Sequence, residues 1–334
     1  MATFVATCQM AIGNYKFSAA NYVEINNSLF ELADTAIVRL PSLKNSLDVA
    51  SKFNKGDLVS ISLGYLGMNK NYQYDEFKGF VKEVKPNVPV EIVCEDAVWL
   101  MRKVNCSVLL KDTSLKGILN YLVSQTNNYW KGQYKIDLAN NVPSIAFDKY
   151  RISNVNAASV LQELKEKYGL VAYFRDFTLH VELPYFEYLN NSSGDVKYSF
   201  AWNILPKPNL TYKSGKETNI RLKAIALQKD NKRITVEVGD PNGELRTKIY
   251  YNIPDKDTLT KVAQNDLGQF KVDSLEGTFK TKLVPFCRPG YSAKMEDPEY
   301  NGARAGTYAV EKVKTVLSMN EGIVRTITPG RRLV

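Results

Sequence analysis

Three short runs near the start of the chain alternate apolar and polar residues, and a segment with this pattern has few folds open to it. In the first run Val59, Ile61 and Leu63 lie on one side, which is the period of a strand with one buried face. Residues 70–75 form a polar connector, and the prolines in residues 86–89 separate the second run from the third. We therefore expect a small antiparallel barrel or sandwich. The runs occupy residues 56–65, 77–84 and 90–96.

A fainter copy of this unit lies at the end of the chain. Phe80-Val81-Lys82-Glu83-Val84 aligns with Ala309-Val310-Glu311-Lys312-Val313, and a turn and another strand follow each segment. The match is short, so the pattern alone leaves both a true duplication and a chance similarity open. The copy runs through residues 289–293, 306–313, 320–322 and 323–327.

Several short motifs within the two units carry a family resemblance. They are Gly56-Asp57-x-Val59, Phe77-x-Gly79-Phe80-Val81, Cys94-Glu95-Asp96-Ala97, Pro289-Gly290 and Gly306-x-Tyr308-x-Val310-x-x-Val313. With these motifs the chain resembles the baseplate or tail hub proteins of tailed phages, also called late control protein D or the 43 kDa tail protein. It is similar in the same way to the N-terminal part of type VI secretion spike proteins.

The resemblance implies a mainly β fold in which two small antiparallel β-barrel domains flank an α+β module. The expected divisions are a first β-barrel domain at residues 1–103, an α+β module at 104–195, and a second β-barrel domain with an inserted helix at 196–334. The length agrees, because 334 residues exceed a usual single domain and a hydrophobic content of 44% is ample for real cores.

The middle of the chain changes character. Asp112-Thr113-Ser114 offers capping oxygens to a helix, and the apolar residues that follow recur at helical spacing. A second amphipathic helix begins near residues 154–156 and ends at Gly169, which supplies a left-handed stop. Residues 170–183 then predict a hairpin. Residues 104–190 therefore predict an α+β module.

The last third of the chain returns to strands. Residues 234–238 alternate, and Asp240-Pro241-Asn242-Gly243 is a strong turn signal that predicts a hairpin with residues 246–251. Asp257 or Thr258 is expected to cap a helix that lies between barrel strands.

The formal charge of +9 admits two interpretations. Lysine and arginine can face a polyanion such as DNA, or they can form a solvated basic surface. The second interpretation is favoured because no basic run is interleaved with aromatic residues in a recognition pattern. The densest clusters are Lys213–Lys216, Lys229–Arg233 and Arg331–Arg332.

Cysteine and histidine are too sparse for a metal centre. The chain has a single histidine and no Cys-x-x-Cys pair, so no metal site and no cofactor is expected, and the thiols should be free and reduced. No stretch approaches the roughly 18 apolar residues of a membrane span, and no basic segment precedes an apolar run at the N-terminus. We therefore expect synthesis in a cytoplasm without an export signal. The cysteines are Cys8, Cys94, Cys106 and Cys287.

No motif for catalysis stands out. His180 lies in an alternating strand without a nucleophile elbow, and adjacent strand residues such as Glu95 and Asp96 point to opposite faces. Residues 302–306 lack the Lys-Ser/Thr of a phosphate loop. The twenty tyrosines suit strands and interfaces as well as stacking. We predict a protein that is not an enzyme, with no catalytic residue.

The resemblance implies a structural hub of a phage tail or a phage-tail-like, contractile-type injection machine. Three copies would form a pseudo-sixfold ring that joins a sixfold tail tube to a threefold spike. Its partners would be two further copies, the tail tube protein, a spike on a separate polypeptide and other baseplate proteins, with nonspecific DNA passage through a central channel. It would be located in the virion tail or baseplate after assembly in the bacterial host cytoplasm.

Several alternatives stay open at this level. A carbohydrate- or host-surface-binding tail module is the main alternative function, and a cell-wall hydrolase is a third. The sequence does not distinguish a contractile tail from a non-contractile one, or a phage from a tailocin or a secretion system.

Overall fold

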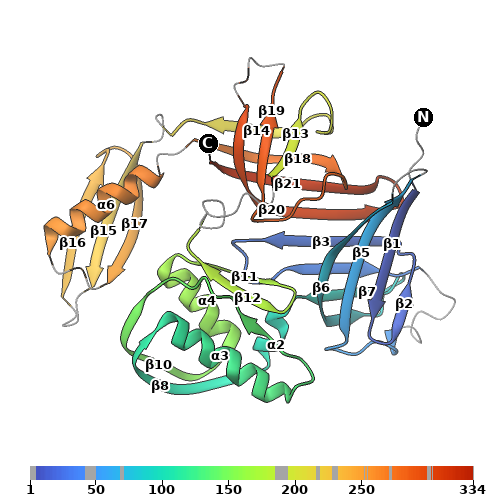
Figure 1. The fold of residues 1–334 in the computed structure, drawn as a ribbon, viewed down its shortest axis with the longest axis horizontal. Helices are drawn as coiled ribbons and strands as arrows, with labels where there is room; N and C mark the ends of the chain where they lie inside the picture. The colour runs from blue at the N-terminus through green and yellow to red at the C-terminus, as the bar shows by residue number, and fades with distance from the viewer. Residues whose placement is uncertain are drawn as a thin grey trace.

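The computed structural model arranges the chain as one long sheet in two halves, an α+β module, and a small separate sheet covered by a helix (Figure 1). It describes residues 5–41, 50–67, 71–184, 195–215, 219–227, 232–251, 253, 255–270, 273–298, 302 and 304–333.

The first half contains the three runs that the sequence predicts as strands, and they correspond to β5, β6 and β7. The prediction of a connector at residues 70–75 is wrong in part, because β6 already begins at Tyr72 and continues the pairing with β5. The strands are β1 (Val5–Ile12), β2 (Tyr15–Phe17), β3 (Tyr22–Ser28), β4 (Thr35–Arg39), β5 (Leu58–Leu66), β6 (Tyr72–Lys85) and β7 (Glu91–Glu95).

The α+β module follows β7. Its two long helices start at the residues that the sequence indicates, and the second also stops where the sequence indicates. Ser114 accepts a hydrogen bond from the Gly117 N–H, Asn156 accepts one from the Ser159 N–H, and Gly169 ends the second helix with a φ of 62°. The elements are α2 (Val98–Arg102), β8 (Asn105–Ser114), α3 (Leu115–Trp130), β9 (Asp137–Leu138), β10 (Ala146–Asn156), α4 (Ala157–Tyr168), β11 (Val171–Arg175) and β12 (Thr178–Glu182).

The second half returns to the long sheet. Strands β20 and β21 are the two runs of the fainter copy, and they form an antiparallel hairpin at residues 320–322, as the sequence predicts. The strands of this half are β13 (Asp195–Ser199), β14 (Asn209–Lys213), β18 (Ser274–Lys282), β19 (Ser292–Glu296), β20 (Gly306–Ser318) and β21 (Gly322–Arg332).

A separate unit is inserted between β14 and β18, and it lies apart from the rest in Figure 1. It has its own core, in which apolar residues of the sheet pack against Leu259 and Ala263 of the helix. Asp255 caps this helix by accepting the Thr258 N–H at 2.7 Å, so the prediction of Asp257 or Thr258 as the cap is wrong by two or three residues. The elements are β15 (Ile220–Leu227), β16 (Arg233–Gly239), β17 (Glu244–Tyr251) and α6 (Lys256–Phe270).

The hairpin predicted between residues 234–238 and 246–251 is wrong. Strand β15 lies between β16 and β17, antiparallel to the first and parallel to the second. The turn itself forms, since Gly243 N–H donates to the Asp240 oxygen at 2.9 Å, but the chain also bonds the start of β15: Asp240 N–H donates to Ile220 and Glu244 N–H to Asn219. A turn signal fixes a change of direction and does not fix which strand becomes the neighbour.

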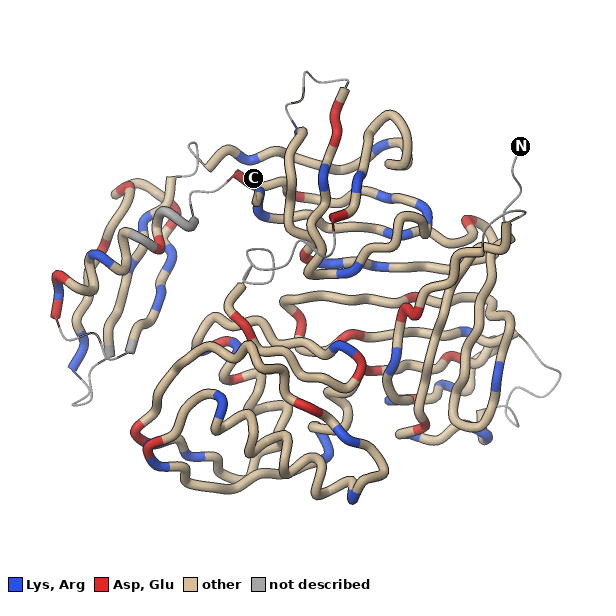
Figure 2. The backbone as a smooth tube through the Cα atoms, in the orientation of Figure 1, with Lys and Arg blue, Asp and Glu red and all other residues tan. Residues whose placement is uncertain are grey.

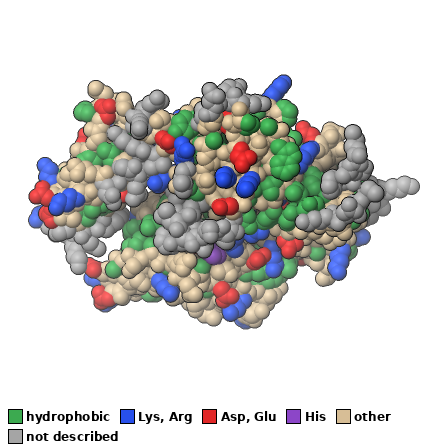
Figure 3. Space-filling model, turned by 45° about the horizontal axis from the view of Figure 1, so that its top comes forward, with side chains coloured by type: hydrophobic (Ala, Val, Ile, Leu, Met, Phe, Trp, Pro, Cys, Tyr) green, Lys and Arg blue, Asp and Glu red, His purple; other side chains and the backbone are tan. Residues whose placement is uncertain are grey.

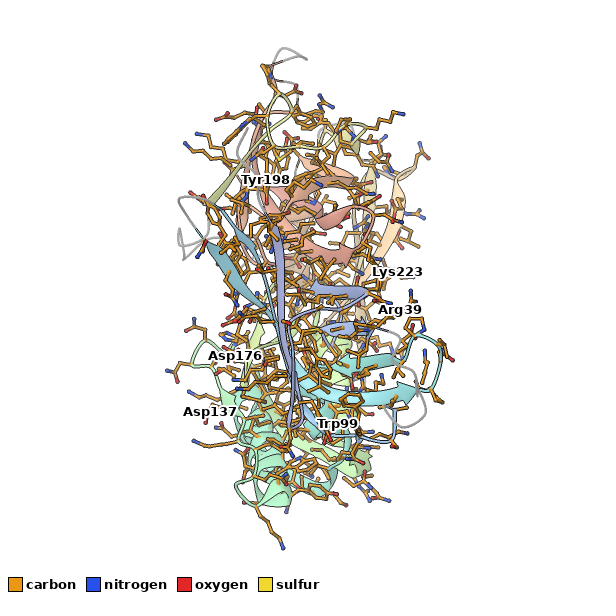
Figure 4. All side chains as sticks on the ribbon, turned by 90° about the vertical axis from the view of Figure 1, so that its right-hand side faces the viewer. Arg39, Trp99, Asp137, Asp176, Tyr198 and Lys223 are labelled. Carbon is orange, nitrogen blue, oxygen red and sulfur yellow. The ribbon has the colours of Figure 1, made fainter. Side chains whose placement is uncertain are left out.

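The mainly β class with an α+β insert is confirmed. The long sheet has thirteen strands, and pairing among the described residues closes neither half into a barrel. Each half has its own core, and so has the module. Figure 4 shows Tyr198, from the core of the second half, in the upper part of the molecule and Trp99, from the core of the module, in the lower part.

Candidate assembly interface

Strands β3 and β20 join the two halves into one sheet. Seven residue pairs align antiparallel along this joint. Lys312 Nζ lies 2.5 Å from Glu31 Oε1 and Lys314 Nζ lies 3.0 Å from Glu24 Oε1, so both lysines of β20 have carboxylate partners in the first half. Partly exposed ion pairs of this kind contribute little, and the backbone ladder carries most of the joint.

A buried arginine also connects the two halves of the sheet. Arg325 of β21 and Glu76 of β6 form an ion pair with side chains that are 0% and 3% exposed. The arginine also donates to Thr315 Oγ1 at 3.3 Å, to the Leu283 oxygen at 2.8 Å and to the Pro285 oxygen at 3.1 Å. Burial raises the pKa of Glu76, while the Arg325 charge opposes that shift. A charge buried this deeply is tolerated because its hydrogen bonds are satisfied.

Apolar and aromatic side chains continue the same contact. Tyr74 of the first half stacks on Phe286 of the second with ring centroids 4.8 Å apart. The Tyr65 hydroxyl donates to the Ile323 oxygen at 3.1 Å. Leu283 and Ile323 belong to the core of the first half, although the chain places them in the second. The junction is therefore packed like a protein interior.

In the first half, two backbone hydrogen bonds connect Gly56 and Asp57 to Val81. Gly56 has a φ of 96°, which only glycine adopts readily. Its N–H donates to the Val81 oxygen at 2.8 Å, and the Val81 N–H donates back to the Asp57 oxygen at 2.9 Å. These two bonds fix the start of β5 against β6.

The same arrangement recurs in the second half. Gly290 has a φ of 93°. Its N–H donates to the Val310 oxygen at 3.0 Å, and the Val310 N–H donates to the Tyr291 oxygen at 2.9 Å. Val310 is the residue that the sequence alignment places opposite Val81, so the two hydrogen-bond pairs are equivalent.

A bulge follows the valine in both halves. The β6–β7 ladder shifts register between Val81 and Glu83, and the β20–β21 ladder shifts between Val310 and Lys312. An extra residue at the same aligned place kinks both strands in the same way. The β20–β21 ladder has a further shift between Tyr308 and Val310, but the extra residue after the aligned valine is common to both halves and favours duplication over a chance match.

The order of the strands repeats as well. The first half runs β3-β4-β7-β6-β5 across the sheet, and the second runs β14-β18-β21-β20-β19. In both cases the five strands, numbered along the chain, appear in the order one, two, five, four, three. The joint between β3 and β20 therefore connects the first strand of one repeat to the fourth strand of the other.

Two buried carboxylates attach the α+β module to the first half. The Asp34 N–H donates to Asp96 Oδ2 at 2.9 Å, and Asp96 Oδ1 accepts the Val98 N–H at 2.9 Å. Asp34 in turn accepts from Asn27 Nδ2 and the Ser28 N–H. Burial raises the pKa of Asp96 well above its ordinary value, and the neighbouring Asp34 raises it further. The pair therefore favours a state with a proton on one carboxyl.

The residues considered for catalysis have structural contacts. Glu95 binds Arg102, with Nη2 to Oε1 at 2.9 Å, whereas its neighbour Asp96 faces the module, so the two carboxylates do not form a pair. His180 lies on β12, stacks on Tyr173 at 5.1 Å and has Nδ1 3.6 Å from Glu182 Oε1.

The segment at residues 302–306 also has a structural contact. Arg304 binds Asp297, with Nε to Oδ2 at 2.7 Å, and lies 3.9 Å above the Phe200 ring. Since the arginine is already held by a carboxylate and an aromatic ring, its role is to fix the turn before β20.

Cysteines and acidic groups offer no metal centre in the described part of the chain. Cys8, Cys94, Cys106 and Cys287 are all buried. Burial raises the pKa of Cys8 to about 11 and that of Cys94 to about 12, which leaves these thiols protonated and unreactive. No helix among the described residues is long and apolar enough to cross a membrane.

The predicted basic clusters are distributed over different units. Lys213 pairs with Glu276 at 2.7 Å, and Arg332 lies 3.6 Å from Asp273. Arg233 is on the inserted sheet, while Lys216 and Lys229 fall outside the described residues. Figure 2 shows lysine and arginine on every unit, with acidic residues beside many of them, and Figure 3 shows the same mixture on one face.

Sequence reasoning missed the buried Arg325, although a signal was present. Ile323, Arg325 and Ile327 alternate on one side of the last strand, so the arginine occupies a position of the buried face. A charged residue at such a position requires an opposite charge from elsewhere. The partner, Glu76, could not be named because it lies far away in the sequence.

Three solved structures share this fold over nearly the whole chain. A tail protein from Neisseria meningitidis is 13% identical, with a TM-score of 0.64, and the match covers 98% of this chain and 96% of that one. The 43 kDa tail protein of prophage MuSo2 from Shewanella oneidensis is 12% identical, with a TM-score of 0.63 and coverage of 98% and 97%.

An Escherichia coli component of the type VI secretion system is 9% identical, with a TM-score of 0.59 and coverage of 97% and 79%, and it is described as similar to bacteriophage T4 tail proteins gp27 and gp5. No family model and no curated protein sequence matches the chain. None of the three structures is described as an enzyme. The resemblance to phage tail and baseplate hub proteins is therefore confirmed at the level of the fold.

Proposed function

We propose that this protein is a structural hub of a phage tail or of a phage-tail-like injection machine, and that three copies form a pseudo-sixfold ring. The observation that carries the proposal is the repeated five-strand order, with its glycine–valine hydrogen bonds, inside one chain. Three chains with two similar units each supply six similar units around an axis, while the chain as a whole repeats only three times.

Such a ring suits a junction between two symmetries. Its repeated sheets would contact a sixfold tail tube protein, and the parts that occur once per chain would contact a threefold spike and other baseplate proteins. The fold shared with two tail proteins and with a secretion-system component supports this assignment. Location in the virion tail or baseplate, assembly in the host cytoplasm and DNA passage through the centre belong to the same proposal.

Electron microscopy of the purified chain tests the ring directly, with its mass measured in parallel by light scattering. The expected result is a particle of three chains whose averages, viewed along the axis, show six similar lobes around a hole. A chain that stays monomeric at high concentration, or an oligomer with a different number of lobes, contradicts the proposal.

A second candidate is a carbohydrate- or host-surface-binding tail module, and one observation favours it. Trp202 lies in the turn region between β13 and β14 with 85% of its surface exposed, which suits stacking on a sugar. Under this alternative the isolated chain binds bacterial surface glycans and Trp202→Ala abolishes the binding. Under the hub proposal glycans do not bind, and the same substitution leaves the ring intact.

A further inference from the structure

The joint between β3 and β20 pairs the first strand of one repeat with the fourth strand of the other. Of the described strands, the remaining first and fourth, β14 and β6, are not paired with each other. Because β14 corresponds to β3 and β6 corresponds to β20, the same contact is expected between β14 and β6. Within one chain these strands lie far apart in the order of the sheet. Among the described residues neither strand has this partner within the chain, and a second copy of the chain offers both.

The C-terminal end of β6 is open on one side. Residues Tyr72–Phe80 pair with β5, but from Val81 onward β7 is the only strand beside β6 among the described residues. This is the stretch where β20 pairs with β3 in the other repeat. Glu83 is exposed there, and Val84 is half-buried.

Backbone groups at this edge of β6 alternate between facing β7 and facing away from it. Leu40 N–H donates to the Val90 oxygen, so Val90 and Ile92 direct their backbone groups toward β4. Glu91 and Val93 then face β6, because backbone groups alternate along a strand. Val84, which lies opposite Ile92, therefore directs its N–H and C=O away from β7, toward open space.

Strand β14 is the matching edge. It pairs with β18 on one side, and no other described strand lies beside it. Phe279 of β18 lies opposite Ile327 of β21, and Val38 of β4 lies opposite the equivalent residue of β7, Ile92, so Phe279 and Val38 are equivalent. Their neighbours Thr278 and Ile37 are then equivalent too. Asn209 of β14, which pairs with Thr278, therefore corresponds to Glu24 of β3, which pairs with Ile37.

Strand β18 shifts by one residue against β21 between Ser274 and Phe279, but its pairing with β14 is continuous over Asn209–Lys213. Counted along β14, Leu210 corresponds to Ile25, and both pack on the core of their half, so Lys213 corresponds to Ser28.

We propose that β14 of one copy pairs antiparallel with the end of β6 of the next copy, in the register of the β3–β20 joint. This inference rests on the proposed ring and specifies its contact. Lys312 opposes Ser28 in the internal joint. The equivalent residues, Glu83 and Lys213, then oppose each other between copies.

The register brings opposite charges together. Lys213 is half-exposed and already lies 2.7 Å from Glu276, so it would stand between two carboxylates once Glu83 arrives. Opposed charges stabilise a cross-strand pair, whereas like charges weaken it. Val84 then pairs with Tyr212, and Lys85 with Thr211.

The contact is short, and proline ends it. Pro86 corresponds to Thr315, which continues the ladder to β3 inside the chain. Proline has no N–H to donate, so the ladder between copies stops there. A joint of this length is weaker than the internal one, which allows copies to fold separately and then assemble.

Heterologous pairing of this kind closes into a ring or grows into a filament, depending on the rotation between copies. Each copy contributes one β14 and one β6, so a ring leaves no open edge of this type. A closed trimer is therefore the outcome that joins this contact to the proposed function.

Disulfide cross-linking tests the register in the full-length chain. Glu83→Cys and Lys213→Cys are introduced together, the assembled protein is mildly oxidised, and denaturing gels are run without reductant. By analogy with Lys312 and Ser28, these positions form a non-hydrogen-bonded pair with a Cα separation of about 4.5 Å, which a disulfide can span. We expect covalent dimers and trimers, which dithiothreitol should reduce to single chains. The native cysteines are buried and add no background.

A register control keeps the result specific. Glu83→Cys with Thr211→Cys places the thiols on the same face but two residues apart along β14, about 7–8 Å away, and should cross-link several-fold less. Each single variant should yield no trimer. Both wild-type side chains at the main positions lie at the surface, so folding is expected to be unchanged and is checked by circular dichroism.

Failure of the contact and failure of the ring give different results. A trimeric ring by mass and microscopy that does not cross-link at Glu83 and Lys213, or that cross-links equally in the shifted pair, overturns the strand contact and leaves the hub function standing. A reduced protein that is monomeric overturns the ring, and the contact falls with it.

Discussion

The two halves of the long sheet share a strand order and differ in what is attached to it. The first half carries the α+β module directly after β7, and the second half carries the β15–β17 and α6 unit between its first two strands. Where that unit is inserted, the first half has only the short connection between β3 and β4. The common part is what the sheet requires, and the additions occur at connections that the sheet tolerates.

The two halves pack on each other, whereas the inserted unit packs on itself. The core of the first half takes in Leu283 and Ile323 of the second, and the Arg325–Glu76 pair is buried between them. The inserted unit has a core of its own. We therefore expect the halves to unfold together, while substitutions inside the inserted unit have local effects.

The largest loss of stability is expected when the buried ion pair between the halves is broken. Arg325→Met leaves Glu76 buried without its partner and should lower the free energy of unfolding by about 3–5 kcal/mol. Urea denaturation followed by fluorescence measures this loss. A loss below about 1 kcal/mol would mean that the two halves do not depend on the pair.

The same variant has an expected pH dependence. Burial raises the pKa of Glu76, so the stability linked to this group is full at low pH and decreases as the pH rises through the raised value. Without the arginine the pKa rises further. The deficit of Arg325→Met should therefore shrink between about pH 8 and about pH 5, and a deficit that grows on acidification would contradict the assignment.

The two equivalent glycines give a matched comparison of the repeats. Gly56→Ala and Gly290→Ala both force a side chain onto a backbone with positive φ, which costs about 1–3 kcal/mol. At Gly56 the new Cβ would also lie 2.6 Å from Trp99 Cη2, and such overpacking adds about 1–3 kcal/mol. Thermal unfolding should show both variants melting below the wild type, and a variant that melts unchanged would contradict the shared role of the two glycines.

A smaller effect is expected where the module docks on the first half. Asp96 has a raised pKa, so its contribution to stability is present at low pH and is lost as the pH rises. Asp96→Asn removes the titrating group but leaves one acceptor oxygen for the N–H groups of Asp34 and Val98, so it should cost on the order of 1 kcal/mol at low pH. This deficit should shrink as the pH rises, because the wild type loses the stability linked to Asp96.

Urea melts across a pH series measure the difference, with the exposed Glu163→Gln as control. Glu95, Glu31 and Arg175 are charged groups near the Asp34–Asp96 pair. A difference between variant and wild type that does not change with pH would rule out a raised pKa at Asp96.

The smallest effect is expected on the surface of the β3–β20 joint. Lys314→Gln removes the ion pair with Glu24, whose atoms are 3.0 Å apart, and should cost about 0.5 kcal/mol. The loss should vanish in high salt, which screens such pairs. A loss of several kcal/mol would show that charge, and not the backbone ladder, holds the halves together.

Local patterns predicted most of the elements. The helix starts at Ser114 and Asn156 and the stop at Gly169 were visible, because capping oxygens and left-handed glycines act within a few residues. The aligned valines at positions 81 and 310 pointed to a repeat, but the equivalent hydrogen bonds and bulges that support it are visible only in the folded structure.

The sequence did not predict which residues contact each other in the candidate interface. Arg325 was recognisable as a charge on a buried face, whereas Glu76 is separated from it by most of the chain. The Asp34–Asp96 pair was missed for the same reason, since neither aspartate marks the other as its neighbour.

By itself, the sequence determined where strands and helices form and which faces are buried, because side-chain period and capping are local properties of the chain. Only the tertiary structure decided which strands become neighbours: β20 beside β3, and β15 between β16 and β17. The physical reason is that the backbone groups of a strand edge are the same for every sequence. The choice of partner therefore depends on how the distant cores pack and on which buried charges meet.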